Sequence, residues 1–180
     1  MPKQFHDLAL FADHTQFYLQ DEVADADLGE AWSREAGERL VAVAPGIVAV
    51  GTQYNCVVPV RVDILERQPP VDTLNYDHIV ECSLSVAGSR IVVAGCTDDF
   101  ADAKRIGLQP GFYRVRVNFA NLDSLSADGL TSYDSYHVQL WRAPQTETLT
   151  LKRRAAATKK VTRSGLKLVW SQDFRCSEQG

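Results

Sequence analysis

Carboxylates form the densest groups of chemically active side chains in this sequence. Five of the ten residues from 21 to 30 are acidic and none is basic; the acidic residues are Asp21, Glu22, Asp25, Asp27 and Glu30. A second group consists of Asp98, Asp99 and Asp102. Segments this polar bury little apolar surface, so both are predicted to be exposed loops. Carboxylates displayed on loops can attract a protein with a basic cleft, and a solvated acidic surface is the simpler alternative.

Histidine and aromatic side chains suggest a rival kind of site. A cleft lined by Tyr18, Trp32, His137 and Trp141 would bind a small molecule or a carbohydrate, or support weak hydrolysis. His137 is the candidate general acid or base of that cleft, and His14 beside Asp13 is a second candidate. A lone histidine near carboxylates is more often an ordinary hydrogen-bonding residue.

The motifs of well-known catalytic and metal chemistry are absent from the sequence. It has no Gly-x-Ser-x-Gly turn, no phosphate-binding glycine loop and no His-Glu-x-x-His pair. The four cysteines include no Cys-x-x-Cys pair, and Asp98-Asp99-x-x-Asp102 lacks the spacing of an EF-hand loop. We therefore expect a protein that is not an enzyme and that holds no metal or cofactor.

Charge divides the sequence into two parts. Residues 1–150 carry 11 Lys and Arg against 21 Asp and Glu, a net of −10, whereas residues 151–180 carry 8 against 2, a net of +6. An acidic body disfavours nucleic acid as its partner and favours a basic protein, such as a nuclease or toxin. We predict one domain over residues 1–152 and a basic tail over residues 153–180.

The composition of the basic tail suggests what the tail contacts. The stretch Lys152–Lys160 is similar in composition to a nucleic-acid or nuclear-import patch, but attraction to the acidic body favours a tail that folds back or is solvated. Leu166–Trp170 is apolar enough to dock on the body.

No export signal follows Met1, and no apolar run approaches the roughly 20 residues of a membrane-spanning helix. We expect a soluble cytoplasmic protein, with its oligomeric state left open.

Strands must position these side chains, and the clearest one begins at Leu108-Gln-Pro-Gly. After Pro110-Gly111, the apolar residues Tyr113, Val115, Val117 and Phe119 alternate with Arg114, Arg116 and Asn118. This period of two predicts a strand with one buried and one solvated face, on which the arginines pair with carboxylates of neighbouring strands. Eight or nine such short strands predict an all-β antiparallel two-layer sandwich, of which the jelly roll is one type.

Five further features specify parts of this sandwich. The change of phase near Asp13-His14 predicts a bulge between two strand segments, and a helical turn near Trp32 is predicted to plug one end. Pro45-Gly46 predicts a hairpin, and Ala87-Gly88-Ser89 predicts a second one between His78–Val86 and Arg90–Gly95. Pro59 indicates an edge position or a site where its missing N–H would face solvent.

Three stretches match, in order, the pattern of a bacterial protein family. His14-Thr-Gln-Phe-Tyr-Leu19 is similar to a His-Gln-Phe strand, with Thr15 inserted. Trp32-Ser-Arg-Glu-Ala36, with Gly46-Ile-Val48 and Gln53-Tyr-Asn55, resembles a Trp-x-x-Glu-Ala segment, a Gly/Ala-Ile strand and a Gln-Arg-Asn sequence. Leu108-Gln-Pro-Gly-Phe-Tyr113 resembles a Leu-Pro-x-Gly-x-Tyr entry to a late strand. The pattern is that of the competence protein J family, known for an inhibitor of the DNA-entry nuclease. The resemblance implies a shared sandwich and, by analogy only, a nuclease as the partner.

Overall fold

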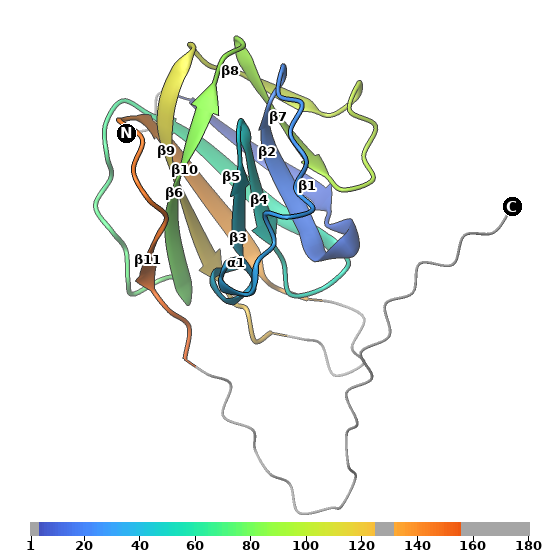
Figure 1. Cartoon of the computed structure of the whole chain (residues 1–180). Coiled ribbons are helices and arrows are strands. Elements are labelled where there is room, and N and C mark those ends of the chain that lie inside the picture. The colour runs from blue at the N-terminus through green and yellow to red at the C-terminus, as the bar shows by residue number, and fades with distance from the viewer. Residues whose placement is uncertain (1–3, 125–131, 156–180) are drawn as a thin grey trace, which may run out of the picture.

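Two facing β-sheets make up the part of the protein that the structure describes (Figure 1). The structure is a computed structural model and describes residues 4–124 and 132–155. The six-stranded sheet contains, in spatial order, β1 (Gln4–Phe11), β5 (Val57–Leu65), β10 (Ser135–Arg142), β9 (Gly111–Ala120), β6 (His78–Val86) and β11 (Leu149–Lys152). The five-stranded sheet contains β3 (Val41–Ala44), β4 (Ile47–Gly51), β2 (Gln16–Asp21), β7 (Arg90–Gly95) and β8 (Lys104–Gly107).

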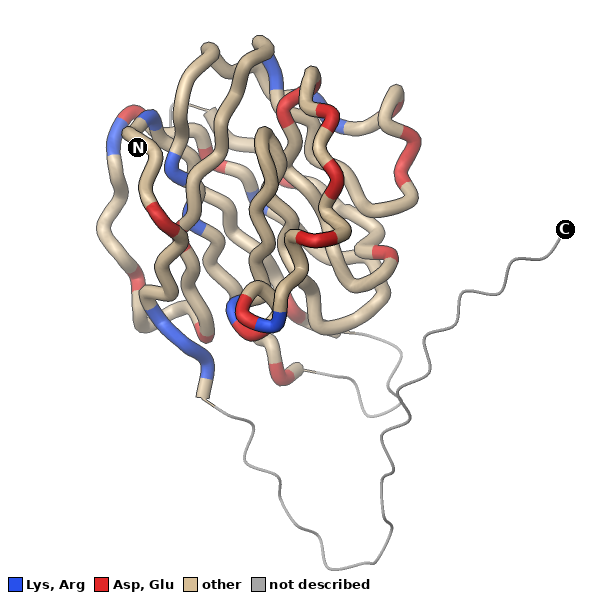
Figure 2. Tube along the Cα trace, viewed as in Figure 1, with Lys and Arg blue, Asp and Glu red and all other residues tan. Residues whose placement is uncertain are grey.

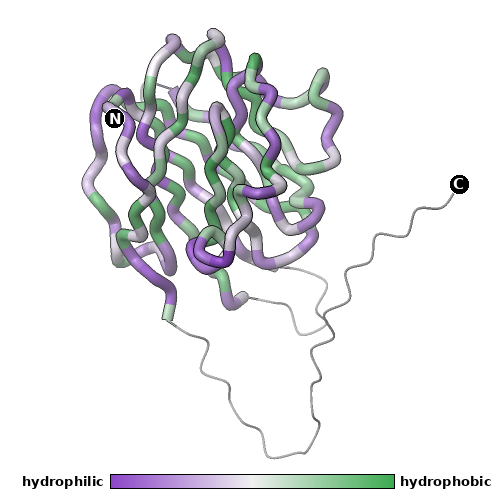
Figure 3. Tube along the Cα trace, in the orientation of Figure 1, coloured by the Kyte–Doolittle hydropathy of each residue, from purple (hydrophilic) through white to green (hydrophobic). Residues whose placement is uncertain are grey.

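The predicted all-β sandwich is confirmed. Every strand pairing among the described residues is antiparallel except that of β5 with β10. The only helices in the described parts of the chain are α1 (Arg34–Arg39) and the 3₁₀ turn η1 (Asp13–Thr15). Figure 3 shows hydrophobic residues concentrated along the strands and hydrophilic ones along the connections. None of the described helices is long and apolar enough to cross a membrane.

Strand β9 lies in the interior of the six-stranded sheet, between β10 and β6. Its apolar face is buried as predicted, and the core side chains it supplies are Tyr113, Val115, Val117 and Phe119. Phe119 meets the Tyr136 ring edge-on, at 5.6 Å between centroids, and Phe17 from the other sheet meets Tyr136 at 5.5 Å. The Phe17–Tyr136 contact therefore joins the two layers, and Phe119 of β9 packs beside it on Tyr136 of β10.

The opposite face of β9 is covered, which corrects the prediction of a solvated face. Arg116 is fully buried and Arg114 is 5% exposed. The predicted pairing with a carboxylate is confirmed, because both guanidiniums reach Glu81 of β6, at 3.4 Å from Arg114 and 2.7 Å from Arg116. Arg116 also donates to the carbonyls of Pro69 and Pro70, at 3.0 and 2.9 Å, in a segment that crosses this face.

The chain changes sheets where a bulge was predicted. His14 and Thr15 have φ values of 52° and 55°, so η1 turns the chain sharply after β1. The backbone N–H of Ala12 then donates to the Cys56 carbonyl at 2.9 Å, while β2 pairs with β4 and β7 of the other sheet. The phase change in the sequence therefore marks a crossing between layers and not a bulge within one strand.

The hairpin prediction is correct at Pro45-Gly46 and wrong at Ala87-Gly88-Ser89. β3 pairs with β4 across Gly46, whose φ is 74°. β6 and β7 instead belong to different sheets, so the turn between them carries the chain across the sandwich. Asp21 holds that turn: its carboxylate accepts the N–H of Ala87 at 2.6 Å and of Gly88 at 3.1 Å.

Of the two alternatives predicted for Pro59, the edge position is wrong, because β5 is an interior strand. The other alternative, a site where the missing N–H faces solvent, agrees with the exposure of Pro59. Pro59 is opposite Ala9 of β1, and the pairing of β5 with β10 starts one residue later, at Val60. Pro59 is therefore next to the end of β10, which offers no ladder partner at that position. A missing N–H is tolerated there because the ladder has not yet begun on that side.

Gly95 lies at the β1–β7 corner, where the backbones of the two sheets come close together. A Cβ added to it would lie 2.1 Å from the carbonyl oxygen of Phe11. Gly95→Ala is therefore expected to lower the free energy of unfolding by about 1–3 kcal/mol, because the backbone must move apart. Gly107→Ala is the matched control, since a Cβ there meets no atom within 4 Å. Urea unfolding that ranks the two variants equally would contradict this account of the corner.

His78 gives the fold a pH dependence. The buried ring lies 2.9 Å from the Arg39 carbonyl through Nε2, and its Nδ1 accepts the Arg154 N–H at 3.3 Å. Burial lowers the pKa of His78 below its ordinary 6.5. The unfolded chain therefore binds a proton first as the pH falls below about 6.5, and stability decreases with acidification in that range.

His78→Gln is expected to make the free energy of unfolding less dependent on pH between about 5 and 7. His14→Gln is the control, because His14 is exposed. Urea titrations over this range measure both slopes. An unchanged slope in His78→Gln would show that other groups cause the acid sensitivity.

Candidate protein-binding surface

The first acidic segment, residues 22–33, connects β2 to α1 across the outer face of the five-stranded sheet. Ala42 and Ala49 are opposite each other on β3 and β4, and their side chains form a small cluster with Ala36 of α1. Four partly buried residues pack on this cluster: Tyr18, Leu28, Ala31 and Trp32. Trp32 therefore anchors the segment on the outside of the sheet, which corrects its predicted place as a plug at the end of the sandwich.

The five carboxylates between residues 21 and 30, of which Asp21 ends β2, have three different environments. Asp25, Asp27 and Glu30 are exposed, as predicted. Glu22 is 2.8 Å from Arg90 and accepts hydrogen bonds from Ser89. Desolvation acts to raise the pKa of Glu22, but the Ser89 hydrogen bonds and the Arg90 charge outweigh it and the pKa is lowered.

Asp21 is the exception to the prediction of an exposed loop. Asp21 is only 2% exposed, and its carboxylate accepts hydrogen bonds from backbone N–H groups of the β6–β7 turn. A carboxylate that already accepts backbone N–H groups in the interior has no face free for a partner. Asp21 is thus a structural residue and is not part of the exposed acidic surface.

The second acidic segment, residues 96–103, connects β7 to β8 on the same sheet. Asp98 accepts the Gly95 N–H at 2.7 Å and Asp99 accepts the Ala101 N–H at 2.9 Å, which fixes the loop. Arg105 donates to the Phe100 and Ala101 carbonyls, at 2.8 and 2.9 Å. Asp98, Asp99 and Asp102 are all exposed, so this loop displays its carboxylates as predicted.

A groove lies beside the second segment, between β1 and β8. Its volume is about 410 Å³, and we name it the β1–β8 groove. It is lined by Leu8, Ala9, Leu10, Val93, Asp98, Asp99, Asp102, Ala103 and Lys104. The lining therefore combines an apolar floor with three carboxylates and a single lysine.

Both acidic segments are connections of the five-stranded sheet, and we call their exposed carboxylates the acidic surface. It consists of Asp25, Asp27, Glu30, Asp98, Asp99 and Asp102. Figure 2 shows acidic residues along both connections on the right of the view. Of these, Asp25, Glu30 and Asp102 accept no side-chain hydrogen bond from any residue in the described ranges. Their charge is available to a partner.

The four residues of the predicted aromatic cleft do not meet in one cleft. Tyr18 and Trp32 pack on the outer face of the five-stranded sheet. His137 and Trp141 lie on β10 of the other sheet, and their neighbours Tyr136, Val138 and Leu140 point into the core between the layers. His137 and Trp141 therefore face away from the five-stranded sheet, and the predicted single cleft is wrong.

His137 is instead part of a hydrogen-bonded array that sequence reasoning missed. Its Nε2 lies 2.8 Å from Asp63 of β5, and its Nδ1 lies 2.8 Å from the Tyr76 hydroxyl. Arg61 completes the array by donating to Asp63 at 2.8 Å. Burial raises the pKa of Tyr76, so its hydroxyl stays protonated near neutral pH. Both ring nitrogens of His137 are occupied, and the array ties the segment before β6 onto the sheet.

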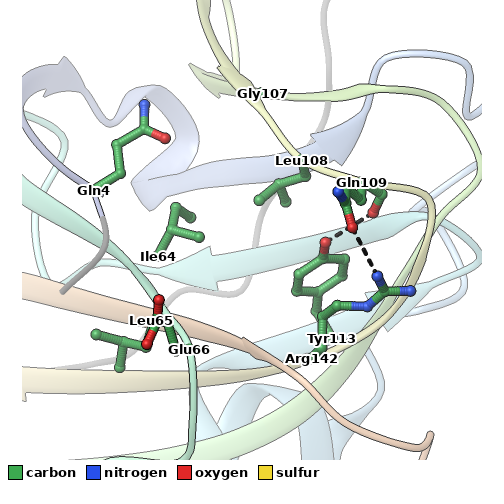
Figure 4. A pocket seen from close by; sticks show the side chains of 9 residues that line it. All are labelled: Gln4, Ile64, Leu65, Glu66, Gly107, Leu108, Gln109, Tyr113 and Arg142. Atoms are coloured by element: carbon green, nitrogen blue, oxygen red, sulfur yellow. Dashed lines mark hydrogen bonds between the residues drawn. The ribbon is translucent and has the colours of Figure 1, made fainter.

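A separate pocket of about 300 Å³ lies where β9 begins (Figure 4). Gln109 links two of its walls, because its carbonyl accepts from the Tyr113 hydroxyl at 2.8 Å and its side chain accepts from Arg142 at 3.0 Å. Glu66 contributes a carboxylate opposite this pair. The Leu108–Tyr113 stretch thus shapes this pocket through hydrogen bonds that brace the strand entry.

Metal chemistry has no assembled ligand set in the described residues. Within 4–124 and 132–155, no three His, Cys, Asp or Glu side chains are arranged to hold a metal ion.

The buried carboxylate of Asp134 is held by hydrogen bonds. Tyr136 and Ser132 donate to Asp134, and the Tyr136 hydroxyl in turn accepts the Gln53 N–H at 3.2 Å. Burial raises the pKa of Tyr136, which keeps this hydroxyl a donor.

Together these features define a class: an all-β two-layer sandwich with an acidic surface on the connections of one sheet. No family model and no curated protein matches the sequence. Two solved structures are similar in fold. One is ComJ, inhibitor of the DNA degrading activity of NucA, from Bacillus subtilis, with a TM-score of 0.57 and 16% identity over 79% of this chain and 98% of that one.

The second similar structure is the product of crocagin biosynthetic gene J, with a TM-score of 0.55 and 16% identity. It covers 80% of this chain and 100% of that chain. The resemblance to the competence protein J family inferred from short motifs is thereby confirmed as a likeness of fold. At this identity the likeness concerns architecture, and it leaves the activity to be argued from the surface.

Proposed function

We propose that this chain is a non-catalytic protein-binding sandwich that inhibits a nuclease, as an inhibitor or immunity-type partner. The partner presents a basic surface to Asp25, Asp27, Glu30, Asp98, Asp99 and Asp102. Enzymes that hold nucleic acid carry clustered Lys and Arg where phosphates bind. A protein with a rigid acidic face can occupy that site and exclude DNA.

The observation that carries the proposal is the acidic surface itself. Its carboxylates lie on two connections that are held rigidly, one by Trp32 on the alanine cluster and one by Asp98 on Gly95. Rigid display lowers the entropy lost on binding and favours a specific partner over a diffuse cloud of cations. The fold of ComJ, an inhibitor of the DNA degrading activity of NucA, supports a nuclease as the partner class.

We also assign the protein to the cytoplasm. Cys56, Cys82 and Cys96 are free thiols in the described structure, and Cys82 is fully buried. Burial raises the pKa of Cys82 to about 12, so this thiol is unreactive in the folded state. Free buried cysteines suit a reducing compartment, where disulfides rarely form.

Affinity capture tests the partner class. The immobilised full chain is exposed to lysate of the source cells, and DNA cleavage is measured in the depleted lysate and in the eluate. The expected result is depletion of a DNA-degrading activity that excess free chain inhibits. A lysate whose DNA cleavage is neither depleted nor inhibited at any salt concentration would contradict the proposal.

A further inference from the structure

The β1–β8 groove is bounded by two unpaired strand edges. β1 pairs with β5 alone and β8 pairs with β7 alone, so each is the outer strand of its sheet. Within the described residues, no backbone hydrogen bond reaches the outward side of either strand. An unpaired edge is a template for one more strand, because its N–H and C=O groups lack partners.

The chemistry of the groove specifies a basic strand with one apolar face. The floor is lined by Leu8, which is half-buried, and by the core residues Leu10 and Val93; the three aspartates form an acidic rim that Lys104 only partly neutralises. The groove at the opposite seam of the sandwich, beside β3, has no charged residue: it is lined by Val43, Ala44, Pro45, Ser83, Ser85, Phe112 and Gln145. Charge therefore distinguishes the two seams and directs a cationic segment to the first.

We propose that the chain's own C-terminal segment Lys159–Trp170 occupies the β1–β8 groove as an added strand along β1. This segment carries Lys159, Lys160, Arg163 and Lys167 and no acidic residue. Leu166, Leu168 and Trp170 recur at every second position, the period of a strand with one apolar face. These apolar residues cover the groove floor, and the cations preceding them meet the aspartates.

The segment starts from the correct end of the sandwich. Arg154, near the end of the described chain, donates to the Gln53 side chain at 2.8 Å, just past β4. Strand register places Gly51 of β4 beside Gln16, and Phe17 beside Gly95 of β7. Two strand spacings, about 10 Å, separate β4 from β7, and the acidic loop follows Gly95. Few residues of linker are needed to cover this distance.

Tethering favours this occupant over a free peptide. A segment joined by a short flexible linker reaches an effective concentration of roughly millimolar, without any additional contact. The docked segment lies against Asp98, Asp99 and Asp102, half of the acidic surface. If the proposed nuclease partner binds there, it must displace this segment, and this consequence alone rests on the proposed function.

Hydrogen exchange of the full chain, without any partner, tests the docking. Amides of β1 are expected to exchange roughly tenfold more slowly in the wild type than in K159E/K160E/R163E at low salt. The difference should shrink in concentrated salt, and adding D102K to the triple variant should partly restore the protection. The amides of β3 serve as the internal control. β3 is the outer strand of the five-stranded sheet on the side opposite β8 and the groove, so its exchange should not change.

A second variant, L166D/L168D, separates strand addition from charge attraction. It leaves every cation in place and removes the apolar face, so it should also release the β1 amides. Equal β1 exchange in the wild type and both variants would overturn the docking. That outcome would leave the nuclease partner to be judged by capture, since no partner is present in the exchange experiment.

Discussion

Replacing Glu81 by glutamine is expected to lower the free energy of unfolding by about 3–5 kcal/mol. The carboxylate of Glu81 lies 2.7 Å from Arg116 and 3.4 Å from Arg114, in an environment where all three residues are nearly or fully buried. Glutamine keeps the shape but leaves two guanidiniums without a counter-charge. Two buried positive charges without an anion are far less stable than the network they replace.

The rest of the network limits how far the arginines can adapt. Arg114 donates to Ser83 at 2.9 Å and to the Glu147 carbonyl at 3.2 Å, and Arg116 packs over the Trp141 ring at 5.2 Å. Neither guanidinium can reach water without disrupting these contacts. Urea unfolding measures the loss, with Glu66→Gln as an exposed control that should change stability little.

A triple replacement tests whether the loss comes from unpaired charge. Arg114→Met, Arg116→Met and Glu81→Leu together remove all three charges and keep side-chain volume. Such replacements of buried ion networks are often neutral or stabilising, so the triple variant should be more stable than Glu81→Gln alone. A triple variant less stable than the single one would show that shape and hydrogen bonds, and not charge, dominate this network.

The second large effect concerns association. Neutralising Asp25, Glu30 and Asp102 as D25N/E30Q/D102N is expected to slow binding to the captured nuclease about tenfold or more at low salt. These three carboxylates steer a basic partner over a distance, and steering acts chiefly on the association rate. The effect should fade as salt shortens the screening length from about 10 Å at 0.1 M to about 3 Å at 1 M.

A variant of equal charge change controls for net charge. E66Q/D123N/E147Q removes three carboxylates from the connections of the six-stranded sheet, away from the acidic surface. Surface plasmon resonance measures both variants across salt concentrations. If the two variants slow association equally, attraction depends on total charge and the acidic surface has no special part in binding.

Much of the fold could be predicted because β9 carries its pattern locally. Tyr113, Val115, Val117 and Phe119 alternate in the sequence and are buried together. The same alternation gave a wrong prediction of solvent exposure for Arg114 and Arg116. A period of two shows which residues share a face of the strand, but it does not show what covers that face. The cover comes from Pro69 and Pro70, about 46 residues away along the chain.

Long-range partners explain the other differences. A turn signal at Ala87-Gly88-Ser89 shows that the chain reverses, but not that Asp21 holds the reversal, 66 positions earlier. The same limit applies to His137, whose partners Asp63 and Tyr76 are 74 and 61 positions away. The exposed carboxylates of the acidic surface could be predicted, since a run dominated by carboxylates, with few large apolar residues, has little to bury.

Hydrogen-exchange footprinting of the complex with the captured nuclease tests the central claim most directly. The acidic segments 22–33 and 96–103 are expected to gain protection, while the Pro69–Tyr76 segment on the opposite sheet keeps its exchange rate. Protection confined to the six-stranded sheet, with both acidic segments unchanged, would contradict a partner that binds through the acidic surface.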